Sequence, residues 1–225
     1  MVSQIQENIA KIRAELPEGV ELVAVSKFFP KEDIADAYEG GQRVFGESRA
    51  QEVVLKAEEL PKDIKWHFIG HLQQNKVKTI APFVSLIQAV DSFKLLREID
   101  KEAKKNGRII PCLLEIHVAQ EETKFGFSPE ECRQMLEKED WQSLSNTRID
   151  GIMCMASNVD DTVQIGKEFH RAYNLFEELK NDFFKEIPTF AIRSWGMSHD
   201  YKIAIKEGCT MVRVGSKIFG SRNYS

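Results

Sequence analysis

Short apolar runs alternate along this chain with stretches whose apolar residues have a helical spacing, and this alternation constrains the fold more than any other feature. The apolar runs are continuous and rich in valine and isoleucine, as is typical of strands buried on both faces. We expect eight strands, at residues 21–26, 43–45, 65–69, 84–90, 109–118, 150–155, 188–194 and 211–214. Strict alternation of strands and helices predicts a parallel sheet.

Helical patterns fill the gaps between these runs, and one more precedes the first strand. The first pattern predicts an amphipathic helix that Pro17 ends, and its apolar positions are Ile5, Ile9, Ile12 and Leu16. Ser128-Pro129-Glu130-Glu131 has the form of a capping box with proline at the first helical position, so a helix should begin there. We therefore expect an extra N-terminal helix ahead of the strand–helix units.

Eight strand–helix units in 225 residues suggest a closed (β/α)8 barrel, with a doubly wound open sheet as the alternative. An open sheet gathers its ligand groups at one switch point, whereas a barrel gathers them from the ends of all its strands. Polar and glycine residues follow almost every predicted strand, at Lys27, 45–47, 67–75, Asp91, His117, 153–155, 195–198 and 213–216. This distribution favours the TIM barrel. With no linker-like tract in the sequence, we expect residues 1–225 to form a single domain.

The composition excludes several classes of protein. A formal net charge of -4 argues against binding nucleic acid by charge neutralisation. The apolar runs are too short to span a membrane, and the N-terminus lacks the pattern of a signal peptide. Four scattered cysteines fit reduced, buried thiols in a cytoplasmic protein. His67 and His71 are four residues apart on a strand-to-loop segment, and we expect no metal site there.

Lys27 directly follows the first apolar run, so a barrel would place it at the mouth. Partial burial there would lower the pKa of its amine, and a neutral amine is the form that attacks an aldehyde to give a Schiff base. The alternative is a lysine that ends a strand and points to solvent. Position alone does not decide between these two interpretations.

Two loops have the character of phosphate-binding loops. Gly196-Met197-Ser198 follows the seventh strand, and Ser198 is a suitable N-cap for a helix to about residue 207. Gly215-Ser216 follows the eighth strand and leads into a short helix. The loops after strands seven and eight form the usual phosphate site of TIM barrels. The alternative for each loop is an ordinary strand-to-helix turn.

Closing the barrel would bring these two loops next to the first strand and Lys27. A phosphate site beside an imine-forming lysine suggests pyridoxal 5′-phosphate (PLP), an aldehyde that carries a phosphate. Arg213, on the eighth strand, could face the pyridine nitrogen of such a ring. A cation there would keep the nitrogen unprotonated and weaken the ring as an electron sink. The alternative for Arg213 is a salt bridge inside the barrel.

The motifs resemble those of the YggS/PROSC family of pyridoxal phosphate homeostasis proteins over residues 5–224. They are Ala24–Lys27, Phe45-Gly46-Glu47, the ten residues 67–76, Val90-Asp91-Ser92, Gly196-Met197-Ser198, and residues 211–220. The resemblance implies one barrel like the N-terminal domain of alanine racemase. It implies Lys27 as the Schiff-base lysine, Ser198, Gly215 and Ser216 at the phosphate, and Arg213 at the pyridine nitrogen. With Met197 of the same loop, these are the cofactor-binding residues that we expect.

Some positions depart from the family pattern. They are Phe29, Ser48, His117 and Trp195, and we expect all four to line the barrel mouth. Lys124 matches a lysine that the family often keeps and is a hypothetical second landing site for PLP.

The resemblance implies a carrier that holds PLP and supplies it to PLP-dependent apo-enzymes without catalytic turnover. The alternative is an amino-acid racemase on the same barrel, which needs a second acid–base group. The sequence ends at Ser225, after the barrel, so we expect neither the domain that supplies that group in alanine racemase nor its dimer surface, and hence a monomer. The tyrosines are expected on helices or in the tail, which leaves His117 as the one spare base. A barrel without a cofactor, in which Lys27 is structural, is the third possibility.

Overall fold

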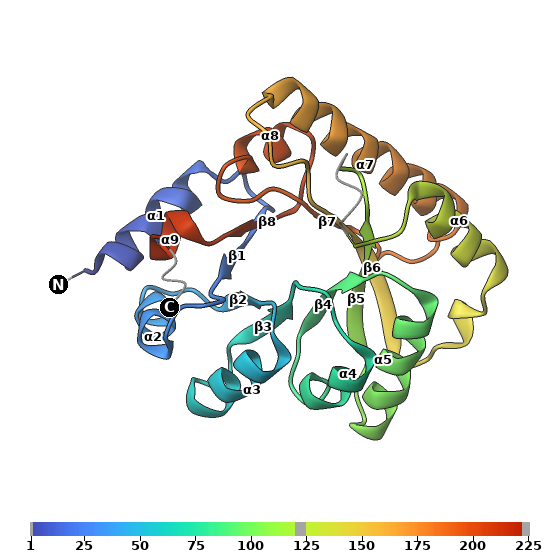
Figure 1. The fold of residues 1–225 in the computed structure, drawn as a ribbon, viewed down its shortest axis with the longest axis horizontal. Helices are drawn as coiled ribbons and strands as arrows, with labels where there is room; N and C mark the ends of the chain where they lie inside the picture. The colour runs from blue at the N-terminus through green and yellow to red at the C-terminus, as the bar shows by residue number, and fades with distance from the viewer. Residues whose placement is uncertain (1, 120–124, 222–225) are drawn as a thin grey trace.

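The computed structural model describes residues 2–119 and 125–221. Eight strands form a closed barrel in which each strand pairs in parallel with the next and β8 pairs with β1 (Figure 1). The strands are β1 (Glu21–Val25), β2 (Val44–Glu47), β3 (Lys65–Phe68), β4 (Leu86–Val90), β5 (Ile110–Ile116), β6 (Thr147–Cys154), β7 (Ile192–Ser194) and β8 (Met211–Val214). The predicted TIM barrel is confirmed.

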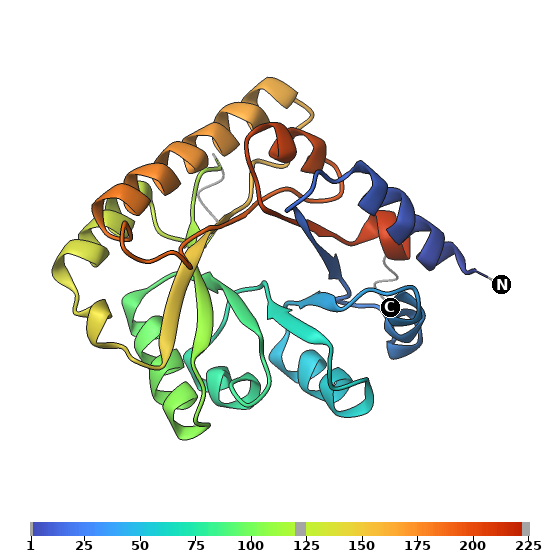
Figure 2. The ribbon, with the colours of Figure 1, turned by 180° about the vertical axis from the view of Figure 1, so that it is seen from behind.

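Helices surround the barrel, as the view from behind also shows (Figure 2). They are α1 (Gln4–Glu15), α2 (Lys31–Glu39), α3 (Ala50–Glu59), α4 (Gln74–Ile80), α5 (Phe93–Lys105), α6 (Pro129–Lys138), α7 (Thr162–Asp182), α8 (Tyr201–Lys206) and α9 (Ser216–Phe219), with a 3-10 turn at Trp141–Ser143. The capping box at Ser128 and Glu131 is present. The extra N-terminal helix is α1, which begins at its N-cap Ser3.

Alternation along the strands divides the core into two layers. Inward-facing side chains fill the barrel with a small apolar cluster of Val23, Val44, Leu86, Ala89, Leu113, Met153 and Met211. Outward-facing side chains, such as Leu22 and Ala24 of β1, join the larger cluster under the helices. Because successive side chains of a strand point to opposite faces, the residue after β1 that continues the inward series is Lys27.

Several predicted boundaries differ from the structure by one or more residues, and two of these differences lie near the end of β7. The seventh strand begins only at Ile192, because Phe190 leaves the sheet direction to stack on Phe176 and Phe184 beneath α7. Helix α8 begins at Tyr201 and its N-cap is Asp200, so the prediction that Ser198 caps this helix is wrong.

Helix α1 closes the outer ring of helices between α2 and α9 (Figure 1). The Asn8 side chain donates to the Ile218 carbonyl of α9 at 3.0 Å, across 210 residues of sequence. The first helix therefore supports the short helix that follows β8.

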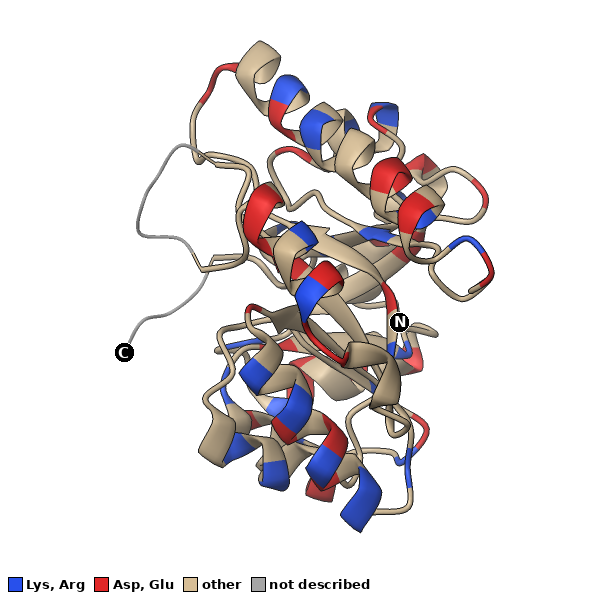
Figure 3. Ribbon diagram, turned by 90° about the vertical axis from the view of Figure 1, so that its right-hand side faces the viewer, with Lys and Arg blue, Asp and Glu red and all other residues tan. Residues whose placement is uncertain are grey.

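Charged residues of both signs are interspersed on the outer helices (Figure 3). In the described part of the chain, no helix is both long and apolar enough to cross a membrane. All four cysteines are buried and free, as predicted.

Candidate functional site

A cavity of about 450 Å³ opens at the C-terminal ends of β1, β7 and β8. This volume lies within the range of about 300–1,000 Å³ that is usual for small-molecule sites. All six residues that the sequence predicted for cofactor binding line it, namely Lys27, Met197, Ser198, Arg213, Gly215 and Ser216. The barrel brings them together because β1 pairs with β8, with Val23 opposite Arg213.

Lys27 is half-buried in this cavity, two residues beyond Val25, which lines its base. It lies in a tight turn, in which the Phe29 N–H donates to the Ser26 carbonyl at 3.1 Å. The sequence-based choice between a cavity lysine and a solvent lysine is therefore decided in favour of the cavity.

The loops after β7 and β8 contact each other where they line the cavity. The Gly215 N–H donates to the Ser198 hydroxyl at 3.2 Å. Gly196 has φ +95, and a Cβ on it would lie 2.6 Å from that of Ala204, so only glycine fits there. Gly215 caps α9, whose first N–H groups have no partner within the helix. Together the two loops present hydroxyl and N–H donors, which suit a phosphate.

Arg213 is buried, and its guanidinium is held by neutral groups. One Nη donates to the Ser194 carbonyl and hydroxyl at 2.8 and 2.6 Å, and the other donates to the Cys154 carbonyl at 2.9 Å. These described contacts include no carboxylate, so the predicted alternative of a salt bridge inside the barrel is not observed among them. Arg213 therefore lines the cavity as a cation that is hydrogen-bonded to neutral oxygens, while the carboxylates of Asp200 and Glu115 act on it through space.

A chain of neutral hydrogen bonds continues from Arg213 across the barrel interior. The Ser194 hydroxyl donates to Gln88 Oε1 at 2.6 Å, and Gln88 Nε2 lies 3.0 Å from His67 Nδ1. We call Ser194, Gln88 and His67 the inner chain. All three are buried, and burial lowers the pKa of His67 to about 3, so the imidazole is neutral. Its Nδ1 therefore accepts the bond from Gln88.

The four departures from the family pattern are not in this cavity. Trp195 is fully buried in the layer between strands and helices, because it points outward from the end of β7. Phe29 is buried against Phe219, with ring centroids 4.9 Å apart. Ser48 lines a separate hollow of about 220 Å³, and His117 follows β5 without reaching the cavity lining. The prediction that these residues line the cavity mouth is wrong for Trp195 and Phe29. Lys124 lies outside the described residues.

Sequence reasoning missed five lining residues, which are Val25, Ile69, Met155, His199 and Ser221. His199 directly follows the Gly196-Met197-Ser198 motif, and its Nε2 is 3.2 Å from the Asp200 carboxylate. Ile69 and Met155 follow β3 and β6, so the inward alternation of those strands was the signal that could have found them.

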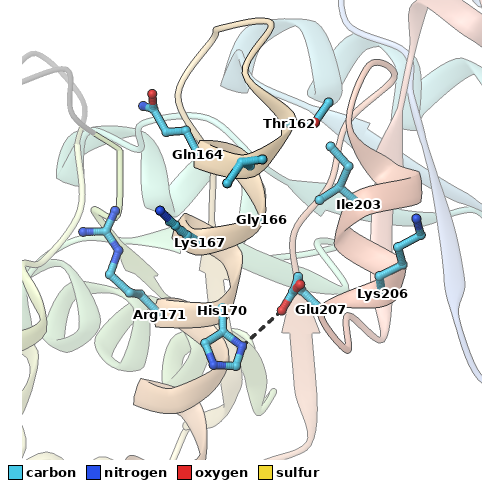
Figure 4. Close-up of a pocket in the computed structure, with 10 residues that line it drawn as sticks. Thr162, Gln164, Gly166, Lys167, His170, Arg171, Ile203, Lys206 and Glu207 are labelled. Atoms are coloured by element: carbon cyan, nitrogen blue, oxygen red, sulfur yellow. Dashed lines mark hydrogen bonds and ion pairs between the residues drawn. The ribbon is translucent and has the colours of Figure 1, made fainter.

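A larger groove of about 810 Å³ lies outside the barrel between α7 and α8 (Figure 4). Lys167, Arg171 and Lys206 line it, and His170 Nδ1 lies 3.1 Å from Glu207 Oε2. It contains none of the predicted site residues. Size alone does not make this groove a functional site. The smaller cavity, which all six predicted residues line, is therefore the candidate site.

Comparison with known proteins shows the family of this chain. The family model of the alanine racemase N-terminal domain matches residues 2–223. A pyridoxal phosphate homeostasis protein of Aquifex aeolicus is 37% identical over 227 residues, covering 99% of this chain and 97% of the relative. The chain therefore belongs to the alanine racemase N-terminal domain family and, within it, to the pyridoxal phosphate homeostasis proteins.

Solved structures extend this comparison. PipY of Synechococcus elongatus PCC7942, solved with PLP bound, is 34% identical with a TM-score of 0.85, covering 96% of this chain and 100% of PipY. Alanine racemase of Clostridium difficile 630 is 16% identical with a TM-score of 0.74, covering 99% of this chain and 56% of the racemase. The racemase likeness extends to the barrel fold alone.

Proposed function

We propose that this protein binds PLP in the cavity at the ends of β1, β7 and β8 and takes part in PLP homeostasis. The observation that carries the proposal is the convergence of Lys27, Arg213 and two donor-rich loops on one cavity. The PLP-bound PipY relative and the names of the curated relatives support the same ligand. Residues 1–225 would act as one PLP-binding domain.

The donor set fits the parts of this cofactor. Ser198, Gly215 and Ser216 would surround the phosphate at the start of α9, where the helix dipole favours an anion; the Gly215 N–H would orient the Ser198 hydroxyl, which is left to donate. Met197 would contact the ring from the same loop. PLP supplies an aldehyde, and the Lys27 amine would replace the aldehyde oxygen, which leaves as water, to give a Schiff base.

Arg213 would set the chemistry of the bound ring. Its guanidinium is held by the Ser194 and Cys154 oxygens, so it presents positive charge toward the pyridine nitrogen. A permanent cation disfavours a proton on that nitrogen and so weakens electron withdrawal by the ring. This arrangement supports a carrier without turnover of its own, which would hand PLP to PLP-dependent apo-enzymes in the cytoplasm and act as a monomer.

Racemisation is the weaker candidate, because it needs a second acid–base group beside the ring. Among the residues that the structure describes, Tyr38, Tyr173 and Tyr201 lie on α2, α7 and α8, and no tyrosine lines the cavity. His117 is absent from the described lining as well. Purified PLP-loaded protein mixed with L-alanine in heavy water should exchange no α-proton, and exchange at an enzyme-like rate would contradict the carrier proposal.

Borohydride trapping tests the cofactor and its lysine together. The PLP-loaded protein should be yellow, and hydride reduction of the Schiff base should leave the pyridoxyl group on the peptide that contains Lys27. Lys27→Ala should lose both the colour and this labelled peptide. Lys206→Ala, in the outer groove, is the control and should keep both. The site assignment is wrong if Lys27→Ala keeps the wild-type absorbance and trapped peptide.

A further inference from the structure

The turn that carries Lys27 has a strained backbone. Phe28, directly after Lys27, has φ +69 and is the one non-glycine residue with positive φ in the described part of the chain. A bulky aromatic residue rarely adopts this left-handed conformation, because its Cβ comes too close to the backbone. Such a conformation persists only where the surrounding structure over-determines it, and it is common at functional sites.

Side chains from outside the turn bind the residues on both sides of Lys27. The Phe28 N–H donates to Glu52 Oε1 of α3 at 2.8 Å. The Ser26 hydroxyl donates to Glu47 Oε1 of β2 at 2.6 Å. Lys27 is thus flanked by one residue held from β2 and another held from α3.

A single ammonium group joins these two attachments. Lys56 Nζ donates to the Ser26 carbonyl at 3.0 Å, to Glu47 Oε1 at 2.8 Å and to Glu52 Oε1 at 2.6 Å. Each bond to a carboxylate is charge-assisted and therefore stronger than a neutral one. We call Glu47, Glu52 and Lys56 the α3 brace.

The α3 brace is too costly to be explained by stability alone. Glu47 is fully buried, Lys56 is 8% exposed, and Glu47 Oε2 is buried without a hydrogen-bond partner among the described groups. Burial raises the pKa of Glu47 to about 7, even beside Lys56. Apolar residues of similar size often stabilise a protein at least as well as buried ions do. What the ions provide is directed bonds to Ser26 and Phe28.

We propose that the α3 brace positions Lys27 by fixing the backbone of Ser26 and Phe28, so that the amine meets the cofactor aldehyde in a preset geometry. This inference rests on the proposed function, because it assigns to Glu47, Glu52 and Lys56 a part in PLP binding. None of the three lines the cavity in the described residues, so they act through Lys27 as positioning residues. Preset geometry raises affinity because less ordering remains to be done on binding.

Glu52→Gln tests the α3 brace with little risk to folding, because the Glu52 side chain is 21% exposed. The change keeps the shape and removes the charge that holds both Phe28 and Lys56. The wild type and the variant are titrated with PLP while the absorbance of the bound cofactor is followed. The loss of a charge-assisted bond should weaken PLP affinity by about tenfold. The pH midpoint of the bound cofactor's spectral change should also move, by about half a unit or more.

Glu59→Gln is the matched control, since Glu59 lies on the same helix and pairs with Lys31 at the surface. It should leave the affinity and the spectral midpoint unchanged. Lys56→Met should weaken PLP binding more than Glu52→Gln does; if it fails to fold, Glu52→Gln alone carries the test.

A purely structural role predicts a different result. Glu52→Gln would then unfold at lower urea concentration, yet its folded form would bind PLP with wild-type affinity and midpoint, and the proposal would be overturned. Failure of the proposed function is distinct from this outcome, because the wild type itself would then form no Lys27 adduct, and the inference would fall with it.

Discussion

Two buried polar networks flank the cavity, and one consists of neutral groups whereas the other consists of charged groups. The inner chain holds Arg213 inside the barrel through neutral groups, whereas the α3 brace holds the Lys27 turn from outside the barrel through ions. Neutral hydrogen-bond partners add no charge to offset that of Arg213, which Asp200 and Glu115 oppose only through space, and Arg213 lines the cavity. Ionic partners compensate one another, and what they transmit to the cavity is backbone position. A buried polar network can thus supply either an electrostatic field or a fixed backbone geometry.

Lys56→Met should have the largest effect on this comparison. It leaves the buried carboxylate of Glu47 without its cation, and breaking a buried ion pair in this way typically costs about 3–5 kcal/mol. The free energy of unfolding, measured with urea near pH 7.5, should fall by that amount. Lys31→Met breaks an exposed pair with Glu59 and should cost far less, because solvent screens that pair. Equal losses would mean that the α3 brace is no more than surface pairing.

His67→Asn should change the acid side of the stability curve. Burial lowers the pKa of His67 to about 3 in the folded state, whereas the unfolded chain takes up the proton below its ordinary value of 6.5. The unfolded state then binds more protons, so stability falls as pH falls from 6.5 toward 3. Asparagine keeps an acceptor for Gln88 but does not titrate. The variant should lose about 2 kcal/mol less than the wild type between pH 6.5 and about 4.5. Parallel curves would show that the inner chain is not neutral.

Glu47→Gln should change the opposite side of the curve. The pKa of Glu47 is raised from 4.5 to about 7 in the folded state, chiefly by burial. The folded state binds more protons between these values, so its stability falls as pH rises from 4.5 to 7. Between about pH 5 and pH 7, the free energy of unfolding measured with urea should fall by about 2 kcal/mol less in the variant than in the wild type. Glu115, whose pKa burial also raises to about 7, is unchanged in both proteins. If the stability of the variant depends on pH as strongly as that of the wild type, Glu47 is not the group that titrates.

Substitution of Phe28 should have the smallest effect. Glycine relieves the positive φ, while alanine loses the same ring and its contact with the Arg49 guanidinium but keeps the strain. Phe28→Gly should therefore be more stable than Phe28→Ala by about 1 kcal/mol in urea unfolding without PLP. If alanine is as stable as glycine, the turn is not strained and needs no brace.

The barrel could be predicted from the sequence because it depends on period and chain order. The six candidate site residues were predicted from chain order together with the motifs that resemble the family. Alternation of strands and helices fixes the ring, and closure of the ring puts Lys27 beside Gly215 whatever the details of the loops. The role of these residues in holding PLP stays a prediction until trapping is done.

Features that depend on which face a side chain takes were not predictable in this way. Trp195 follows the end of a strand, as Lys27 does, yet its side chain points outward. Successive residues of a strand point to opposite faces, so a difference of one position reverses the side on which a side chain lies. The N-cap of α8 is Asp200 and not Ser198. Serine and aspartate both suit an N-cap, so residue type alone could not distinguish these two positions. The bonds of Lys56 to Ser26 and Glu47 join separate elements and leave no local pattern in the sequence.

The contact between α1 and α9 has a consequence for how the protein is made. Asn8 and Ile218 are 210 residues apart, and β1 completes its pairing only with β8. During synthesis, Lys27 leaves the ribosome long before the loops beside α9, so its cavity lacks these donor loops until α9 has emerged. Long-range closure of this kind is slow. A nascent chain should therefore gain affinity for PLP only after α9 has left the ribosome, in one step and not by degrees.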